Sequence, residues 1–139
     1  MRVTTAMLAD SAQVHGGKLF ILGGGFDTIR TRSVPAVHKA LSVVMVVEVS
    51  PGERETNLSI EVTLMDEDMQ SLGPRASGTL RVGDAPTHRP GQQSVVPLAI
   101  PFYDLRLPRE QAYVFRVTHQ EEELARIPFT VLVVPRPPT

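Results

Sequence analysis

The sequence contains no cysteine and no tryptophan, and neither sign of charge dominates it. Without cysteine there can be no disulfide framework, no thiolate nucleophile and no thiolate zinc site. Lys and Arg together number 14 and Asp and Glu 15, so the formal net charge is -1, which gives no general attraction for nucleic acid or anionic lipid. We therefore expect no nucleic-acid partner and no membrane partner, and the missing cysteines favour a cytoplasmic location.

Long hydrophobic runs are also missing. The longest uninterrupted apolar run, residues 43–47, is far shorter than the roughly 20 residues of a membrane-spanning helix. Near the N-terminus, threonines interrupt a mildly apolar stretch and Asp10 ends it, so we expect no secretory signal.

Proline and glycine are plentiful, at 12 and 10 residues, and they separate short apolar runs. The clearest run is residues 57–65, where apolar and polar side chains alternate as in a strand with one buried face. Residues 94–102 and 112–118 show the same alternation, and Pro97 and Pro101 place the first of these at a sheet edge. About eight to ten such strands favour an all-β fold, an antiparallel β-sandwich.

The domain organisation follows from the same pattern. We expect one β-sandwich domain over residues 1–134 and a flexible, proline-rich tail over residues 135–139. Glycines 23–25 indicate a sharp bend at a sheet corner, and residues 10–17 a loop between two strands. Glycine 73 and proline 74 are expected to interrupt the strand after the turn at residues 66–70.

Two strands are apolar on both faces, residues 41–49 and 131–134. Such a strand is either covered on both sides by its own chain or covered on one side by a partner. The second interpretation gives a candidate interface made of the following residues: Val43, Met45, Val47, Leu132 and Val134.

Motifs for catalysis, cofactors or metals are weak. The glycine triplet lacks the spacing of a dinucleotide or phosphate loop, and the acidic turn Asp66, Glu67 and Asp68 lacks that of an EF-hand. A calcium site assembled from several loops, for example with Asp27 or Asp104, stays an alternative to a solvated hairpin turn. The four histidines form no ligand pair: His15, His38, His88 and His119. We therefore expect no catalytic residue, no cofactor, no metal and no enzyme activity.

Two resemblances bear on the fold. Residues 98–134, with Leu-x-Leu-Pro, Tyr-x-Phe-x-Val and Pro-Phe-Thr-Val, resemble the last strands of immunoglobulin-like and fibronectin-like sandwiches, which implies an immunoglobulin-like fold. Residues 1–10, 17–27 and 35–38 are similar to an uncharacterised bacterial family of unknown function. That resemblance implies a small cytoplasmic bacterial protein and supplies no activity, cofactor or catalytic residue.

Together these features predict a non-catalytic binding or assembly module. We expect it to self-associate through a sheet face or edge, as a homodimer, with another protein as the alternative partner. A small-molecule or carbohydrate-binding β-sandwich domain is the alternative function, although aromatic residues, at 5%, are few for a sugar-stacking site.

Overall fold

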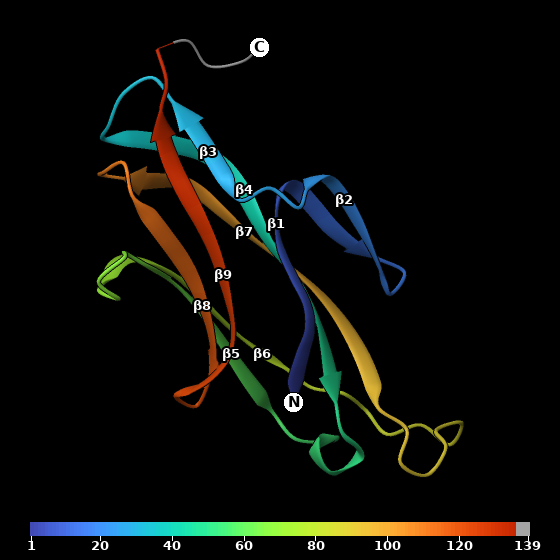
Figure 1. Ribbon diagram of the computed structural model, residues 1–139. Coiled ribbons are helices and arrows are strands. Elements are labelled where there is room, and N and C mark those ends of the chain that lie inside the picture. The colour runs from blue at the N-terminus through green and yellow to red at the C-terminus, as the bar shows by residue number, and fades with distance from the viewer. Residues whose placement is uncertain (136–139) are drawn as a thin grey trace.

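The computed structural model describes residues 1–135, and in them the only helix is a 3₁₀ turn, Pro51–Glu53. The nine strands form two stacked sheets (Figure 1). The all-β class, the sandwich and the number of strands are as the sequence predicts. The predicted tail lies mostly outside the described residues, since only Pro135 belongs to them.

Sheet A has the strand order β2-β1-β4-β7, with every neighbouring pair antiparallel. Its strands are β1 (Arg2–His15), β2 (Lys18–Gly24), β4 (Ala36–Val49) and β7 (Ser94–Leu107). β4, which contains the run apolar on both faces, lies between β1 and β7. β7 lies at the edge, as Pro97 and Pro101 predict.

Sheet B has the strand order β3-β9-β8-β5-β6, and only the β3–β9 pair is parallel. Its strands are β3 (Thr28–Thr31), β5 (Leu58–Met65), β6 (Ser71–Leu80), β8 (Ala112–His119) and β9 (Glu122–Val133). The alternating residues of β5 and β8 place their apolar side chains in the core, as expected.

The core lies between the inner faces of the two sheets and is built around aromatic rings. Phe115 lies 5.0 Å from Phe102 and 5.6 Å from Phe129, measured between ring centroids. Tyr113 stacks on Phe129 at 5.5 Å. Because Phe102 belongs to sheet A and the other three rings to sheet B, this cluster joins the two sheets.

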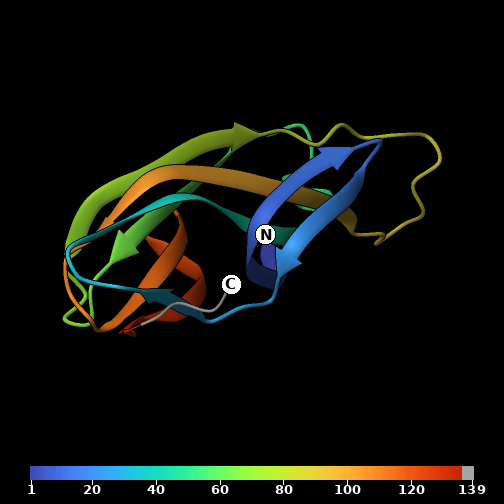
Figure 2. The ribbon, with the colours of Figure 1, turned by 90° about the horizontal axis from the view of Figure 1, so that it is seen from above.

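The β1–β2 hairpin folds back over the outer face of sheet A. β1 pairs with β4 only from Arg2 to Ala9, and its second half pairs with β2 instead. Figure 2 shows this hairpin crossing β4 and β7 on the side away from β8 and β9, and both β1 and β2 come close to β7 without pairing with it. Val44 points to this outer face beside Met7, yet it is 0% exposed. The hairpin therefore covers the second face of β4.

Gly24 allows this fold-back. A Cβ atom at Gly24 would lie 2.7 Å from Cγ2 of Ile21, 3.2 Å from Sδ of Met7 and 3.7 Å from Cβ of Ala9. The glycine thus leaves room for the side chains that pack between the hairpin and β4. The neighbouring glycines 23 and 25 have φ of 64° and 86°, and the segment passes from sheet A to β3 of sheet B, so the predicted sheet corner is confirmed.

One boundary differs from the sequence prediction, that of β1, and the interruption expected at residues 73–74 takes the form of a bulge. β1 continues through residues 10–15, so the connection to β2 is only the turn Gly16–Gly17, with φ of 58° and 74°. β6 extends through Pro74, but its pairing with β5 is interrupted there: Arg75 lies opposite Thr63 and Ser71 opposite Met65, so residues 72–74 form a bulge at this sheet edge. β9 continues through Pro128, which has no backbone N–H. Because β3 pairs only with Thr130–Val133, the missing N–H leaves no carbonyl of β3 without a hydrogen-bond donor.

A buried arginine fixes the end of the sandwich that holds the long β6–β7 connection. Nε of Arg54 donates to Oγ of Ser94 at 3.0 Å, and its guanidinium also donates to the carbonyl of Gln92 and lies 3.5 Å from Asp84.

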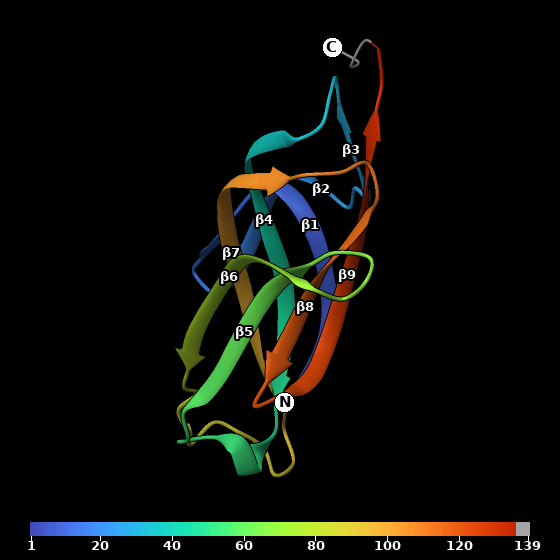
Figure 3. The same cartoon turned by 90° about the vertical axis from the view of Figure 1, so that its left-hand side faces the viewer.

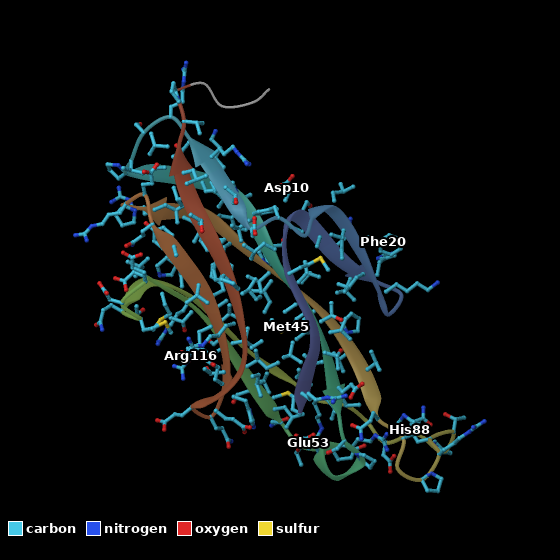
Figure 4. All side chains as sticks on the ribbon, viewed as in Figure 1. Asp10, Phe20, Met45, Glu53, His88 and Arg116 are labelled. Carbon is cyan, nitrogen blue, oxygen red and sulfur yellow. The ribbon has the colours of Figure 1, made fainter. Side chains whose placement is uncertain are left out.

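The neighbouring residue, Glu53, is an ionised carboxylate held by two partners. Burial raises the pKa of Glu53, but hydrogen bonds from the Met1 ammonium and from Ser50 outweigh this and lower the pKa to about 2. Figure 4 labels Glu53 at this end.

The connection between β7 and β8 is closed by one tyrosine. The Tyr113 hydroxyl donates to the carbonyl of Arg109 at 2.8 Å and accepts from the amide of Arg109 at 3.0 Å. A tyrosine that bonds to the backbone a few residues upstream is typical of immunoglobulin-type sandwiches.

We predict that Tyr113→Phe lowers the free energy of unfolding by about 1–2 kcal/mol, because it leaves two backbone groups of Arg109 without their partner. Urea unfolding measures the change. Tyr103→Phe is the control, since Tyr103 is 70% exposed, and it should have no effect. Equal stabilities of the two variants would contradict the role given to the Tyr113 hydroxyl.

We predict that Gly24→Ala lowers the free energy of unfolding by about 1–3 kcal/mol, because the new methyl group overlaps Ile21 and Met7. Gly78→Ala is the matched control: it also lies in a strand, and its Cβ would meet nothing within 4 Å. The denaturant midpoints of unfolding of the two variants measure this difference in stability. A Gly24→Ala protein as stable as Gly78→Ala would show that the hairpin does not pack tightly on β4.

Candidate functional site

The structure corrects the interface that the sequence suggests on β4. Val43, Met45 and Val47 are each 0% exposed and belong to the core between the sheets. They cannot meet a partner, because sheet B covers their face and the hairpin covers the opposite face. Of the remaining two candidates, Leu132 is 40% exposed and Val134 is partly buried, at the end of β9 beside β3.

The sheet edges differ in how they are protected against pairing with another strand. The β7 edge carries Pro97 and Pro101, which cannot donate a backbone hydrogen bond. The β6 edge carries Pro74 next to Gly73, whose φ of 101° disturbs the regular strand. The β3 edge is only four residues long. β2 is seven residues long and contains no proline. Like β6 it has a glycine with positive φ, Gly23 at 64°, but this glycine lies near the end of the strand and leaves residues 18–22 without such protection.

The outward face of β2 is apolar. Phe20 is 54% exposed and Leu22 is 72% exposed, and their cross-strand neighbours on β1 are Gln13 and Ser11. Figure 4 shows Phe20 on the hairpin at the side of the molecule, pointing away from the strands of the sandwich. Leu19 and Ile21 point the other way and are partly buried. The strand is therefore apolar on both faces, but within residues 1–135 only the inner face is covered.

The free backbone groups of β2 follow from the hairpin register. In a hairpin with a two-residue turn, the closing pair His15–Lys18 is hydrogen-bonded, and hydrogen-bonded pairs then alternate with non-bonded pairs. Phe20 and Leu22 thus bond to β1, whereas the amides and carbonyls of Leu19 and Ile21 point to the open edge. Among the described residues, neither Leu19 nor Ile21 makes a backbone hydrogen bond to a turn or loop. These groups can bond to an added strand.

A second, polar surface lies on the outer face of sheet B, which Figure 3 shows from the side of β5 and β6. A groove of about 970 Å³ lies over β5, β6 and β8 and is lined mostly by hydroxyl-bearing and charged side chains. Arg116 at its side is engaged by Glu123, at 2.9 Å. Hydrogen bonds from Arg126 and Arg116 lower the pKa of Glu123, although burial opposes them. The polar lining includes Ser59, Glu61, Ser77, Thr79 and Thr118.

The other candidate sites from the sequence have structural roles or lack partners. Oδ1 of Asp66 accepts hydrogen bonds from the amides of Asp68 and Gln70, both at 2.9 Å, as a hairpin turn requires. Within residues 1–135, no three His, Asp or Glu side chains are grouped so that they could hold a metal ion. His38 has a buried Nε2 without a hydrogen-bond partner, and His119 contacts the carbonyl of Ser59 at 2.7 Å.

The sequence contains a signal for the apolar outer face of β2, which the sequence prediction missed. Residues 19–22 are all apolar and follow a tandem-glycine turn, which predicts a strand apolar on both faces. This run is shorter than residues 41–49 and as long as residues 131–134. The part of the chain that the structure describes holds no helix with the length and hydrophobicity to span a membrane.

No curated protein matches this chain. Among solved structures, a beta-glucuronidase from glycoside hydrolase family 2 is similar over 69% of the chain, with 13% sequence identity and a TM-score of 0.39. The similar part covers 11% of that enzyme's chain, so this protein corresponds to a small part of it. A likeness of this size says nothing about activity. The model of a family of unknown function, DUF6941, matches residues 4–132, and the chain belongs to this family.

Proposed function

We propose that this protein is a non-catalytic binding module that takes up an extended strand along the open edge of β2. One observation carries the proposal: Phe20 and Leu22 are 54% and 72% exposed on a strand whose outer backbone edge pairs with no other strand among residues 1–135. An added strand would form main-chain hydrogen bonds to Leu19 and Ile21 and cover the two apolar side chains. Main-chain bonds give affinity in this mode of recognition, and side-chain contacts give specificity.

The chemistry of the chain supports a module without catalysis. Its cysteine-free sequence offers no thiolate nucleophile, and its described histidines and carboxylates form no metal cluster. Oγ of Ser59 lies 3.5 Å from Nδ1 of His119, but this nitrogen is 2.7 Å from the carbonyl of Ser59 and donates to it, so it cannot take the hydroxyl proton. The buried polar groups with the most hydrogen bonds, such as Arg54, hold loops in place. A cytoplasmic location is part of the proposal and rests on the absence of cysteine.

The test is binding of a fluorescently labelled peptide that copies Lys18–Gly24, followed by fluorescence anisotropy. We expect Leu22→Lys to weaken binding about tenfold, because a charge replaces an apolar side chain that the peptide would cover. Val37→Lys is the matched control, since Val37 is also exposed, at 57%, but lies on β4. No binding by the unaltered protein, or equal weakening by both variants, would contradict strand addition at β2.

The groove on sheet B supports a second candidate, a site for a small polar molecule or a neutral carbohydrate. Its lining combines hydroxyls of Ser77, Thr79 and Thr118 with the carboxylates of Glu61 and Glu121, which suit a ligand with many hydroxyl groups. Because the acidic groups outnumber the one arginine, an anionic ligand is disfavoured.

For this candidate we predict that a neutral oligosaccharide raises the melting temperature, by the equivalent of about 2.7 kcal/mol at a hundredfold excess over Kd. Thr118→Arg should abolish the rise, because the long side chain fills the groove. Thr5→Arg, an exposed position on β1, should not. If a panel of neutral mono- and oligosaccharides gives no rise, the groove is a solvated sheet face.

A further inference from the structure

The sequence of β2 is suited to pair with itself. Antiparallel pairing places two residues opposite each other only when both direct their backbone groups toward the shared edge or both direct them away. On the open side of β2 the residues that point toward the edge are Leu19 and Ile21, whereas glycine 23, with φ of 64°, departs from the regular strand. Antiparallel pairing that places Ile21 opposite Ile21 of a second β2 strand is therefore allowed. Because Ile21 is the middle residue of Lys18–Gly24, this register overlaps the two strands over their full length.

This register also pairs the side chains well. Phe20 lies opposite the partner's Leu22, so the two most exposed side chains of the strand cover each other in each of two symmetric pairs. Lys18 lies opposite the partner's Gly24, so the two ammonium groups stay at opposite ends of the paired strands. Other registers shorten the ladder, and one shifted by two residues places Lys18 opposite the partner's Leu22.

We propose that the strand added to β2 is β2 of a second copy of this chain, antiparallel, with Ile21 opposite the partner's Ile21. This inference rests on the proposed function and names its partner. The two hairpins then join two copies of sheet A into one continuous sheet around a twofold axis. Each copy brings only seven residues to the contact, which is at the low end of interface sizes. The dimer is therefore weak and dissociates on dilution.

The absence of cysteine from the chain makes disulfide trapping a direct test, because every disulfide must come from an introduced cysteine. Opposite residues of a non-bonded antiparallel pair have Cα atoms about 4.5 Å apart, within the range of a disulfide. Diagonal neighbours are about 7–8 Å apart and out of that range. Phe20→Cys mixed with Leu22→Cys should thus form a disulfide-linked dimer, at least about fivefold more than either variant alone.

The control for random collision is Val37→Cys, which is similarly exposed but lies away from β2. Sedimentation equilibrium of the cysteine-free protein should show a mass that rises toward twice 15.2 kDa with concentration, and Leu22→Lys should keep the single-chain mass. Circular dichroism confirms that each variant is folded, which is expected because both altered side chains are exposed.

Efficient cross-linking of Phe20→Cys or Leu22→Cys alone would overturn the register. A single-chain mass at every concentration, with no cross-linking above the Val37→Cys control, would overturn self-association. Binding of the Lys18–Gly24 peptide then separates the two proposals. If the protein is a monomer but binds the peptide at β2, strand addition is supported and the second copy is excluded as the partner. A dimer unaffected by Leu22→Lys would overturn the second copy as the partner of β2, and peptide binding would again decide strand addition.

Discussion

The need to cover both faces of β4 determines the arrangement of the molecule. Val43 and Met45 point inward and are covered by sheet B, whereas Val44 points outward and would be exposed on a flat sheet. The chain meets this requirement by bending β1 near Ala9 and folding its second half, with β2, over the outer face. Gly24 leaves the space that this packing needs. The hairpin, and with it the exposed edge of β2, is thus a consequence of a strand that is apolar on both sides.

The strands that the sequence predicts well are those with one buried face and one solvent-exposed face. In β5, Leu58, Ile60, Val62 and Leu64 alternate with polar residues, so sequence alone assigns the strand and its buried side. Strand continuity is harder to predict, because it depends on neighbours far away in the sequence. Pro128 is tolerated within β9 only because β3 pairs beyond it, and no local pattern contains that information.

The sequence predicts that the candidate site is an apolar strand surface, but it does not predict which strand carries it. A surplus of apolar side chains indicates a partner, but the sequence cannot distinguish a partner from another part of the same chain, and on β4 the cover is the β1–β2 hairpin. Proline does mark an edge, as Pro97 and Pro101 do in β7, because it cannot donate to a ladder. An edge without proline carries no such mark. The open edge of β2 emerges only when the strand order is known.

The absence of proline from β2 is itself weak evidence for a partner, because packing explains it. Leu19 and Ile21 are the positions where proline would block the open edge without breaking a bond to β1, and both are partly buried on the face opposite Phe20 and Leu22. Replacing either would remove an apolar side chain from that face. Phe20 and Leu22 have no such explanation. They face outward, and lysine or serine there would keep every backbone bond of the hairpin. The apolar character of these two side chains, rather than the missing proline, is therefore the observation on which the proposed partner strand rests.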